Sequence, residues 1–186
     1  MTSGEAFVSM DRLLEETRSG PTFLRQPAIA DVVLASLDHG AQIGHYDLHA
    51  WAIMPNHVHL LLTPVVSLSK LLGSLKTATA TQANLLLHRT GQPFWQDESY
   101  DHVVRNEREF ARIRLYIENN PARAGLVAFP EDYPWSSARG LLTRNGKSRC
   151  GAASQAAAVS QTAPPTVREQ AGCKPAAGRG PAPQHP

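Results

Sequence analysis

The sequence is poor in cysteine and lacks any long apolar run. Only Cys150 and Cys173 occur in 186 residues, so neither a disulfide framework nor a cysteine zinc site follows, and we expect a reducing, cytoplasmic setting. No apolar run approaches the length that spans a bilayer, and the acid-containing first residues lack the apolar core of a signal peptide. We therefore expect no membrane partner. A net charge of only +2 permits a nucleic-acid partner without demanding one.

The composition changes near residue 144. Before this point apolar residues recur with regular periods, whereas the rest is Ala, Pro, Gly, Ser and Gln with almost no large side chains. Such a composition buries too little area to offset the entropy of ordering. We predict one catalytic domain over residues 1–144 and a disordered tail over residues 145–186.

The periodicity before residue 144 predicts strands and helices around a central hairpin. In the first strand Tyr46, Leu48 and Ala50 should share one face. The Pro55-Asn56 break before the next strand favours an antiparallel hairpin. The order of elements indicates an α+β fold with an antiparallel sheet. The predicted helices are 6–18, 27–38, 69–88 and 107–120, and the predicted strands are 45–54, 57–64 and part of 94–104.

The second strand carries two histidines at alternate positions. Because side chains two apart on a strand point the same way, His57 and His59 should project together, with Val58, Leu60 and Leu62 on the other face. Two imidazoles at this spacing can hold one divalent ion. A polar pair on a solvent-facing strand is the alternative. The apolar character of the strand favours a central position in the sheet. Burying polar side chains there costs free energy unless they have partners.

Tyr116 lies in the predicted helix 107–120, beside an apolar stripe that includes Ile113 and Ile117. Arg112 and Asn120 lie one turn before and after it on the same face. A phenol can attack phosphorus, an amide oxygen can complete a metal site, and a guanidinium can hold phosphate. A boundary tyrosine with a packed ring and a surface hydroxyl is the alternative.

The segments PNHVHLLL, FWQDESYDHVVRNEREFARIRLYIENNPARAGLV and YPWSSA together resemble the IS200-like transposase family, most closely its REP-associated tyrosine transposase branch. The resemblance covers about residues 27–142. It implies a ferredoxin-like antiparallel sheet with helices, the HUH endonuclease fold, with the tyrosine helix across the face that bears the histidines. It implies Mg²⁺ or Mn²⁺ on His57, His59 and Asn120. It further implies that Tyr116 attacks the scissile phosphate of single-stranded or hairpin DNA, giving a 5′-phosphotyrosine and a free 3′-hydroxyl during transposition or processing of repeat hairpins.

The first residues depart from this pattern. Family members usually begin with a strand, rich in aromatics and Thr, that lies next to the histidine strand. Here MTSGEAFVSMDRLLEE resembles the connection after such a strand. Two explanations stay open: the sequence starts late, or the strand is absent and the sheet has an exposed inner edge. In the second case a partner chain fills the gap, or the protein is a remnant of the family that binds nucleic acid without catalysis. Both a monomer and a homodimer are compatible with the sequence.

Basic and aromatic residues are candidates for DNA contact. Acidic residues are interleaved among them, so no single basic stripe emerges. Phe94, Trp95 and Tyr100 could stack on unpaired bases, with core packing as the alternative. His102 is a further polar candidate, with a surface strand position as its alternative. The expected phosphate contacts are Lys70, Lys76, Arg89, Arg105, Arg112, Arg114 and Arg123.

Two rival functions depend on the same histidines. A histidine-triad hydrolase requires a third histidine at the next alternate position of the strand, and this chain has Leu61 there. A structural zinc site lacks cysteine ligands in the predicted ordered region.

Overall fold

The computed structural model describes residues 21–96, 99–140 and 156–162. The predicted helix 6–18 lies outside these residues. No helix of the described part is both long and apolar enough to cross a bilayer. The elements are η1 (Phe23–Arg25), α2 (Pro27–Gln42), β1 (Tyr46–Ile53), β2 (His57–Pro64), α3 (Leu68–Leu86), β3 (Tyr100–Val103), α4 (Glu107–Arg123), η2 (Pro130–Asp132), η3 (Ser137–Arg139) and β4 (Ala157–Thr162).

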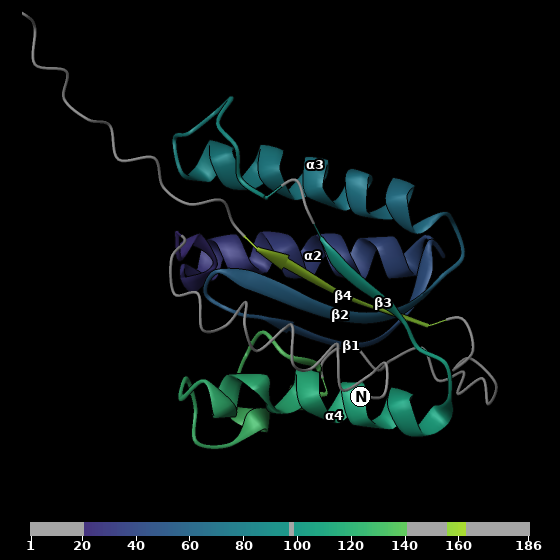
Figure 1. Cartoon of the computed structure of the whole chain (residues 1–186). Helices are drawn as coiled ribbons and strands as arrows, with labels where there is room; N and C mark the ends of the chain where they lie inside the picture. The colour runs from purple at the N-terminus through teal and green to yellow at the C-terminus, as the bar shows by residue number, and fades with distance from the viewer. Residues whose placement is uncertain (1–20, 97–98, 141–155, 163–186) are drawn as a thin grey trace, which may run out of the picture.

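The described strands form one antiparallel sheet in the order β1-β2-β4-β3. Helices α2 and α3 cover one face of this sheet, and α4 covers the other (Figure 1). This arrangement confirms the predicted α+β class with an antiparallel sheet, and it is consistent with the HUH endonuclease fold. Both faces of the sheet are therefore buried, which explains why β2 reads as an almost continuous apolar run.

The predicted hairpin is confirmed, with β1 and β2 paired antiparallel. A β-bulge between Leu48 and Ala50 shifts the register. As a result Leu48 packs toward α2 and α3, whereas Ala50 joins the cluster beneath α4. The prediction that Tyr46, Leu48 and Ala50 share a face is therefore wrong for Ala50. The bulge inserts one extra residue and so reverses the alternation beyond it.

The larger of two hydrophobic cores lies between the sheet and the helix pair α2 and α3. From β2 it receives Val58, Leu60 and Leu62, as the period of two predicted. Helix α2 contributes Val33 and Leu37, which are four residues apart and so lie on one face. Each buried leucine of this kind stabilises the fold by roughly 1.5–3 kcal/mol. This core fixes the orientation of β2 and so directs the two histidines to the opposite face.

Helix α4 begins where the sequence predicted and ends later. The Asn106 side chain caps it by accepting a hydrogen bond from the Glu109 backbone N–H at 2.9 Å. We predicted an end at Asn120, but the helix includes Pro121 and runs to Arg123. Proline removes only one donor, and the Ala124 N–H still bonds to the Asn120 carbonyl, so the last turn closes.

The strand β4 corrects the prediction that residues 145–186 form no ordered structure. Ala157–Thr162 pair with β2 on one side and with β3 on the other. A slot between two strands supplies hydrogen-bond partners on both edges, and this compensates for the small side chains. Ala156 and Ala158 lie under α4, whereas Val159 enters the larger core. The inner edge that would be exposed if the first strand were absent is therefore occupied by β4 of the chain itself. The remaining residues of the predicted tail lie outside the described part.

Candidate active site

His57 and His59 lie side by side on the face of β2 that α4 covers. Their Nε2 atoms are 2.8 Å apart, and their ring centroids are separated by 4.5 Å. The side chains are 3% and 0% exposed. Since β2 has a neighbour on each side, the strand is internal and the alternative of a solvent-facing polar pair is wrong.

Burial favours the neutral form of His59, and the second ring nitrogen of His57 contacts a neighbouring side chain. The Nδ1 of His57 lies 2.7 Å from the Asn56 side-chain oxygen, which is an acceptor. In the tautomer that donates this hydrogen bond from Nδ1, the Nε2 nitrogen keeps its lone pair. Burial lowers the pKa of His59 to about 3, which keeps that ring uncharged. A neutral ring held by a hydrogen bond from its second nitrogen is the usual form of a metal-binding histidine. From the sequence we had assigned Asn56 only to a turn. Its position directly before His57 could have indicated that its side chain contacts the histidine ring.

Asn120 of α4 adds a third polar group to the histidine pair. Its Nδ2 lies 2.9 Å from the Nε2 of His59, and the side chain is 1% exposed. Its Oδ1 has no hydrogen-bond partner among the described residues. Since amide oxygen and nitrogen exchange by a 180° rotation, Oδ1 can take the position that faces the rings. A buried amide oxygen without a partner fits a site that a cation completes.

The donor set formed by His57, His59 and Asn120 fits one divalent cation. It offers two ring nitrogens and one amide oxygen from two elements of the fold. Mg²⁺ prefers oxygen ligands, so the two nitrogens favour Mn²⁺. Within the described residues no group of three or more His, Cys, Asp or Glu side chains could hold a metal. Three protein ligands would leave coordination positions for substrate or water oxygens.

Tyr116 lies on the side of the sheet that carries the histidines. Its ring centroid is 6.3 Å from that of His59, and the side chain is 6% exposed. It belongs to the buried stripe of α4 together with Ile113 and Ile117. The guanidinium carbon of Arg123 lies 5.0 Å from the centre of the Tyr116 ring. The structure therefore brings together four residues that the sequence predicted as a site: the two histidines, the tyrosine and Asn120.

Five of the basic residues that we expected to contact DNA phosphates fall into two groups on opposite sides of the sheet. Arg105, Arg112 and Arg123 are exposed along α4 and just before it. Lys70 and Lys76 belong to α3, across the sheet (Figure 1). The structure does not bring the two groups together, because α3 packs on the face opposite the histidines.

The aromatic candidates near α3 make packing contacts. The Trp95 indole N–H donates to the Thr79 hydroxyl at 2.8 Å, and Lys76 donates to the Gln96 carbonyl at 2.8 Å. Phe94 is fully buried and contacts the Trp95 ring edge-on, at 4.9 Å between centroids. Phe94 is thus a core residue rather than a base-stacking platform, and Trp95 is anchored against the same core.

His102 forms a pair with Glu109 that links β3 to the first turn of α4. The His102 Nε2 lies 3.1 Å from Glu109 Oε1, and the Arg105 backbone N–H donates to Glu109 Oε2 at 2.8 Å. Burial alone would raise the pKa of Glu109, but the hydrogen bonds from Arg105 and His102 and nearby positive charge lower it overall. His102 is therefore not the surface residue of our alternative reading; it helps to hold the helix that carries Tyr116.

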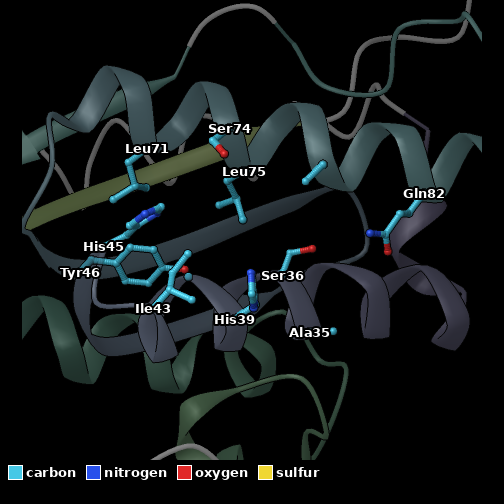
Figure 2. A pocket seen from close by; sticks show the side chains of 12 residues that line it. Ala35, Ser36, His39, Ile43, His45, Tyr46, Leu71, Ser74, Leu75 and Gln82 are labelled. Carbon is cyan, nitrogen blue, oxygen red and sulfur yellow. The ribbon is translucent and has the colours of Figure 1, made fainter.

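A cavity of about 380 Å³ lies between α2 and α3 (Figure 2). Its polar lining includes His39, His45 and Ser74, and its apolar lining includes Leu71 and Leu75. None of the four clustered residues lines it. It belongs to the α2 and α3 side of the sheet and is separate from the candidate active site.

Comparisons with known proteins are in line with this geometry. Residues 22–120 match the family model described as "Transposase IS200 like". A REP-associated tyrosine transposase of Escherichia coli (strain K12) is 26% identical over 102 residues, which cover 52% of this chain and 59% of that protein. The chain thus spans about three-fifths of the length of this curated relative. No solved structure matches significantly.

Proposed function

Because the chain belongs to the IS200-like transposase family, we propose that it is a transposase that cuts and rejoins single-stranded DNA through Tyr116. One observation carries this proposal. The Tyr116 ring comes from α4 and the His59 ring from β2, yet their centroids lie 6.3 Å apart on one face of the sheet. A phenol held beside a pair of buried imidazoles that can bind a metal can act as an activated nucleophile toward phosphorus.

In the proposed reaction the Tyr116 hydroxyl oxygen attacks the scissile phosphorus. The new oxygen–phosphorus bond forms while the bond from phosphorus to the 3′ oxygen breaks. The phenol loses its proton, and the departing 3′ oxygen takes up a proton to become a hydroxyl. The products are a 5′-phosphotyrosine and a free 3′-hydroxyl. Because the phosphodiester energy is kept in the tyrosine ester, the same hydroxyl can reverse the step and rejoin the strand.

His57, His59 and Asn120 would hold the cation, Mn²⁺ or Mg²⁺. When bound, it would polarise a phosphate oxygen and offset the charge that develops at phosphorus. The protein's contribution is to keep the His59 imidazole neutral by burial, to hold the His57 ring through its contact with Asn56, and to direct the Asn120 amide toward the pair. This fixed arrangement avoids reorganising polar groups during the reaction.

The four clustered side chains are almost fully buried, and we propose that DNA reaches them when α4 separates locally from the sheet. The sheet face beneath α4 is rich in alanine, including Ala50, Ala52, Ala156 and Ala158. Alanines offer little apolar area, so this separation costs less than opening the larger core. Arg112 and Arg123 are exposed on α4, and we assign to them the phosphates that flank the cleaved position.

A covalent adduct between the protein and DNA tests the proposal. Purified protein is incubated with Mn²⁺ and a labelled single strand that contains a hairpin, and adducts are separated under denaturing conditions. We expect an adduct with the wild type and none with Tyr116→Phe. An adduct of undiminished yield in Tyr116→Phe would remove the tyrosine from its proposed role.

Tyr46→Phe is the matched control for Tyr116→Phe. The Tyr46 hydroxyl is also buried, where it donates to the Leu37 carbonyl at 2.7 Å, but it lies on the other side of the sheet. We expect this variant to form adduct as the wild type does. If the wild type binds the single strand but forms no adduct, the rival function as a non-catalytic nucleic-acid-binding protein replaces ours.

A further inference from the structure

The strand β4 brings one polar side chain to the candidate active site. Ser160 is paired directly with His59 in the antiparallel register of β4 and β2. Residues directly opposite in such a pair project to the same face, with Cβ atoms about 5 Å apart. Ala158, two residues earlier, belongs to the cluster under α4, and Val159 belongs to the opposite core. Ser160 therefore faces α4, on the side of the histidines.

The Ser160 hydroxyl has no structural task among the described residues. The side chain is 2% exposed, and its Oγ has no hydrogen-bond partner there. Burying a hydroxyl without a partner costs about 1–3 kcal/mol, so an alanine at this position would give a more stable fold. Ala156 and Ala158 occupy the two preceding inward positions of this segment, which shows that the slot accepts alanine.

We infer that Ser160 is a phosphate-binding residue of the active site, donating a hydrogen bond from Oγ to a non-bridging oxygen of the scissile phosphodiester. This inference rests on the proposed function. Serine hydroxyls commonly contact nucleic-acid phosphates, and an anionic oxygen is a strong acceptor. A neutral hydroxyl is a poorer cation ligand than the histidine and amide donors already present. Ser160 is as buried as His59 and Asn120, so the opening that admits a phosphate to His59 also exposes Ser160.

Ser160→Ala in the full chain tests this assignment. We expect adduct formation to slow about tenfold, the effect of one hydrogen bond to a charged oxygen. We expect the melting temperature to be unchanged or higher, because Ser160 Oγ makes no hydrogen bond to the residues that the structure describes. Mn²⁺ affinity, measured by calorimetric titration of the metal alone, should stay unchanged. Ser74→Ala is the control, since Ser74 is exposed on α3 across the sheet.

A binding measurement separates this inference from the proposed function. In protein that carries Tyr116→Phe, fluorescence anisotropy gives the affinity for the labelled hairpin strand with Mn²⁺, and adding Ser160→Ala should weaken it about tenfold. This comparison tests whether Ser160 contributes to DNA binding even if the wild type forms no adduct. Equal affinities with and without the hydroxyl would overturn the inference. So would a loss of Mn²⁺ affinity, which would assign Ser160 to the cation instead.

Discussion

Replacing Asn120 with leucine separates the contribution of this amide to the fold from its proposed contribution to cation binding. The change removes the Nδ2 contact with His59, which is worth about 0.5–1.5 kcal/mol. It also removes the buried Oδ1 that lacks a partner among the described residues, which relieves about 1–3 kcal/mol. Leucine has a similar shape, so little cavity forms. We therefore expect the variant without metal to lie between about 0.5 kcal/mol less stable and about 2.5 kcal/mol more stable than the wild type.

Thermal unfolding followed by circular dichroism, in EDTA and in Mn²⁺, measures both effects. For a chain of this size 1 kcal/mol shifts Tm by about 2–4 °C, so in EDTA we expect Asn120→Leu to melt between about 2 °C below and about 10 °C above the wild type. Mn²⁺ at about 100 times its Kd should stabilise the wild type by about 2.7 kcal/mol. Asn120→Leu has one metal ligand fewer, so the same Mn²⁺ concentration should stabilise it much less.

Asn84→Leu is the matched control for Asn120→Leu. Asn84 is also buried, donates one hydrogen bond at 2.7 Å to the Gln92 carbonyl, and has an Oδ1 without a partner in the described part of the chain. It lies on α3, away from the histidines. The Asn84→Leu variant should keep the rise in Tm that Mn²⁺ gives the wild type. Our reasoning is refuted if Asn120→Leu loses more than about 1.5 kcal/mol in EDTA, or if Mn²⁺ raises its Tm as much as that of the wild type.

Three further predictions concern the parts of the fold that hold the site. Ile117→Ala should lower the free energy of unfolding by about 2–5 kcal/mol in urea titration, because Ile117 is fully buried between α4 and the sheet; an unchanged midpoint contradicts this packing. Val159→Asp should cost several kcal/mol in the same assay, since it places a charge in the larger core, and a neutral effect would argue against β4 in the sheet. Glu109 has a pKa below its ordinary 4.5, so it contributes stability above about pH 4.5 that is lost as the pH falls through the folded pKa. Glu109→Gln should therefore be less stable at neutral pH and lose less stability on acidification, and a parallel loss in both proteins would contradict this.

The histidine pair and the tyrosine helix could be predicted from the sequence because both depend on local periods. Alternation along β2 directs His57 and His59 away from Val58, and helical spacing puts Asn120 one turn beyond Tyr116. Which face of the sheet α4 covers does not follow from these periods. The family resemblance supplied that expectation, and the 6.3 Å between the rings of Tyr116 and His59 agrees with it.

The bulge and the fourth strand could not be predicted, for two different physical reasons. The bulge beside His49 depends on how β1 pairs with β2, and nothing in the local sequence of β1 encodes it. Ala157–Thr162 carry little hydrophobic signal, because their order comes from backbone hydrogen bonds to two neighbouring strands. Ser160 was missed for this second reason. The separation of Lys70 from Arg112 likewise depends on the packing of α3, which local periodicity does not determine.

Mass spectrometry of the protein–DNA adduct tests the central claim most directly. After digestion by protease and nuclease, we expect nucleotides on the peptide that contains Tyr116, with fragment ions that place a 5′-phosphate ester on its phenol oxygen. An adduct whose fragments place the nucleotide on another residue would contradict the account, even if cleavage itself is efficient.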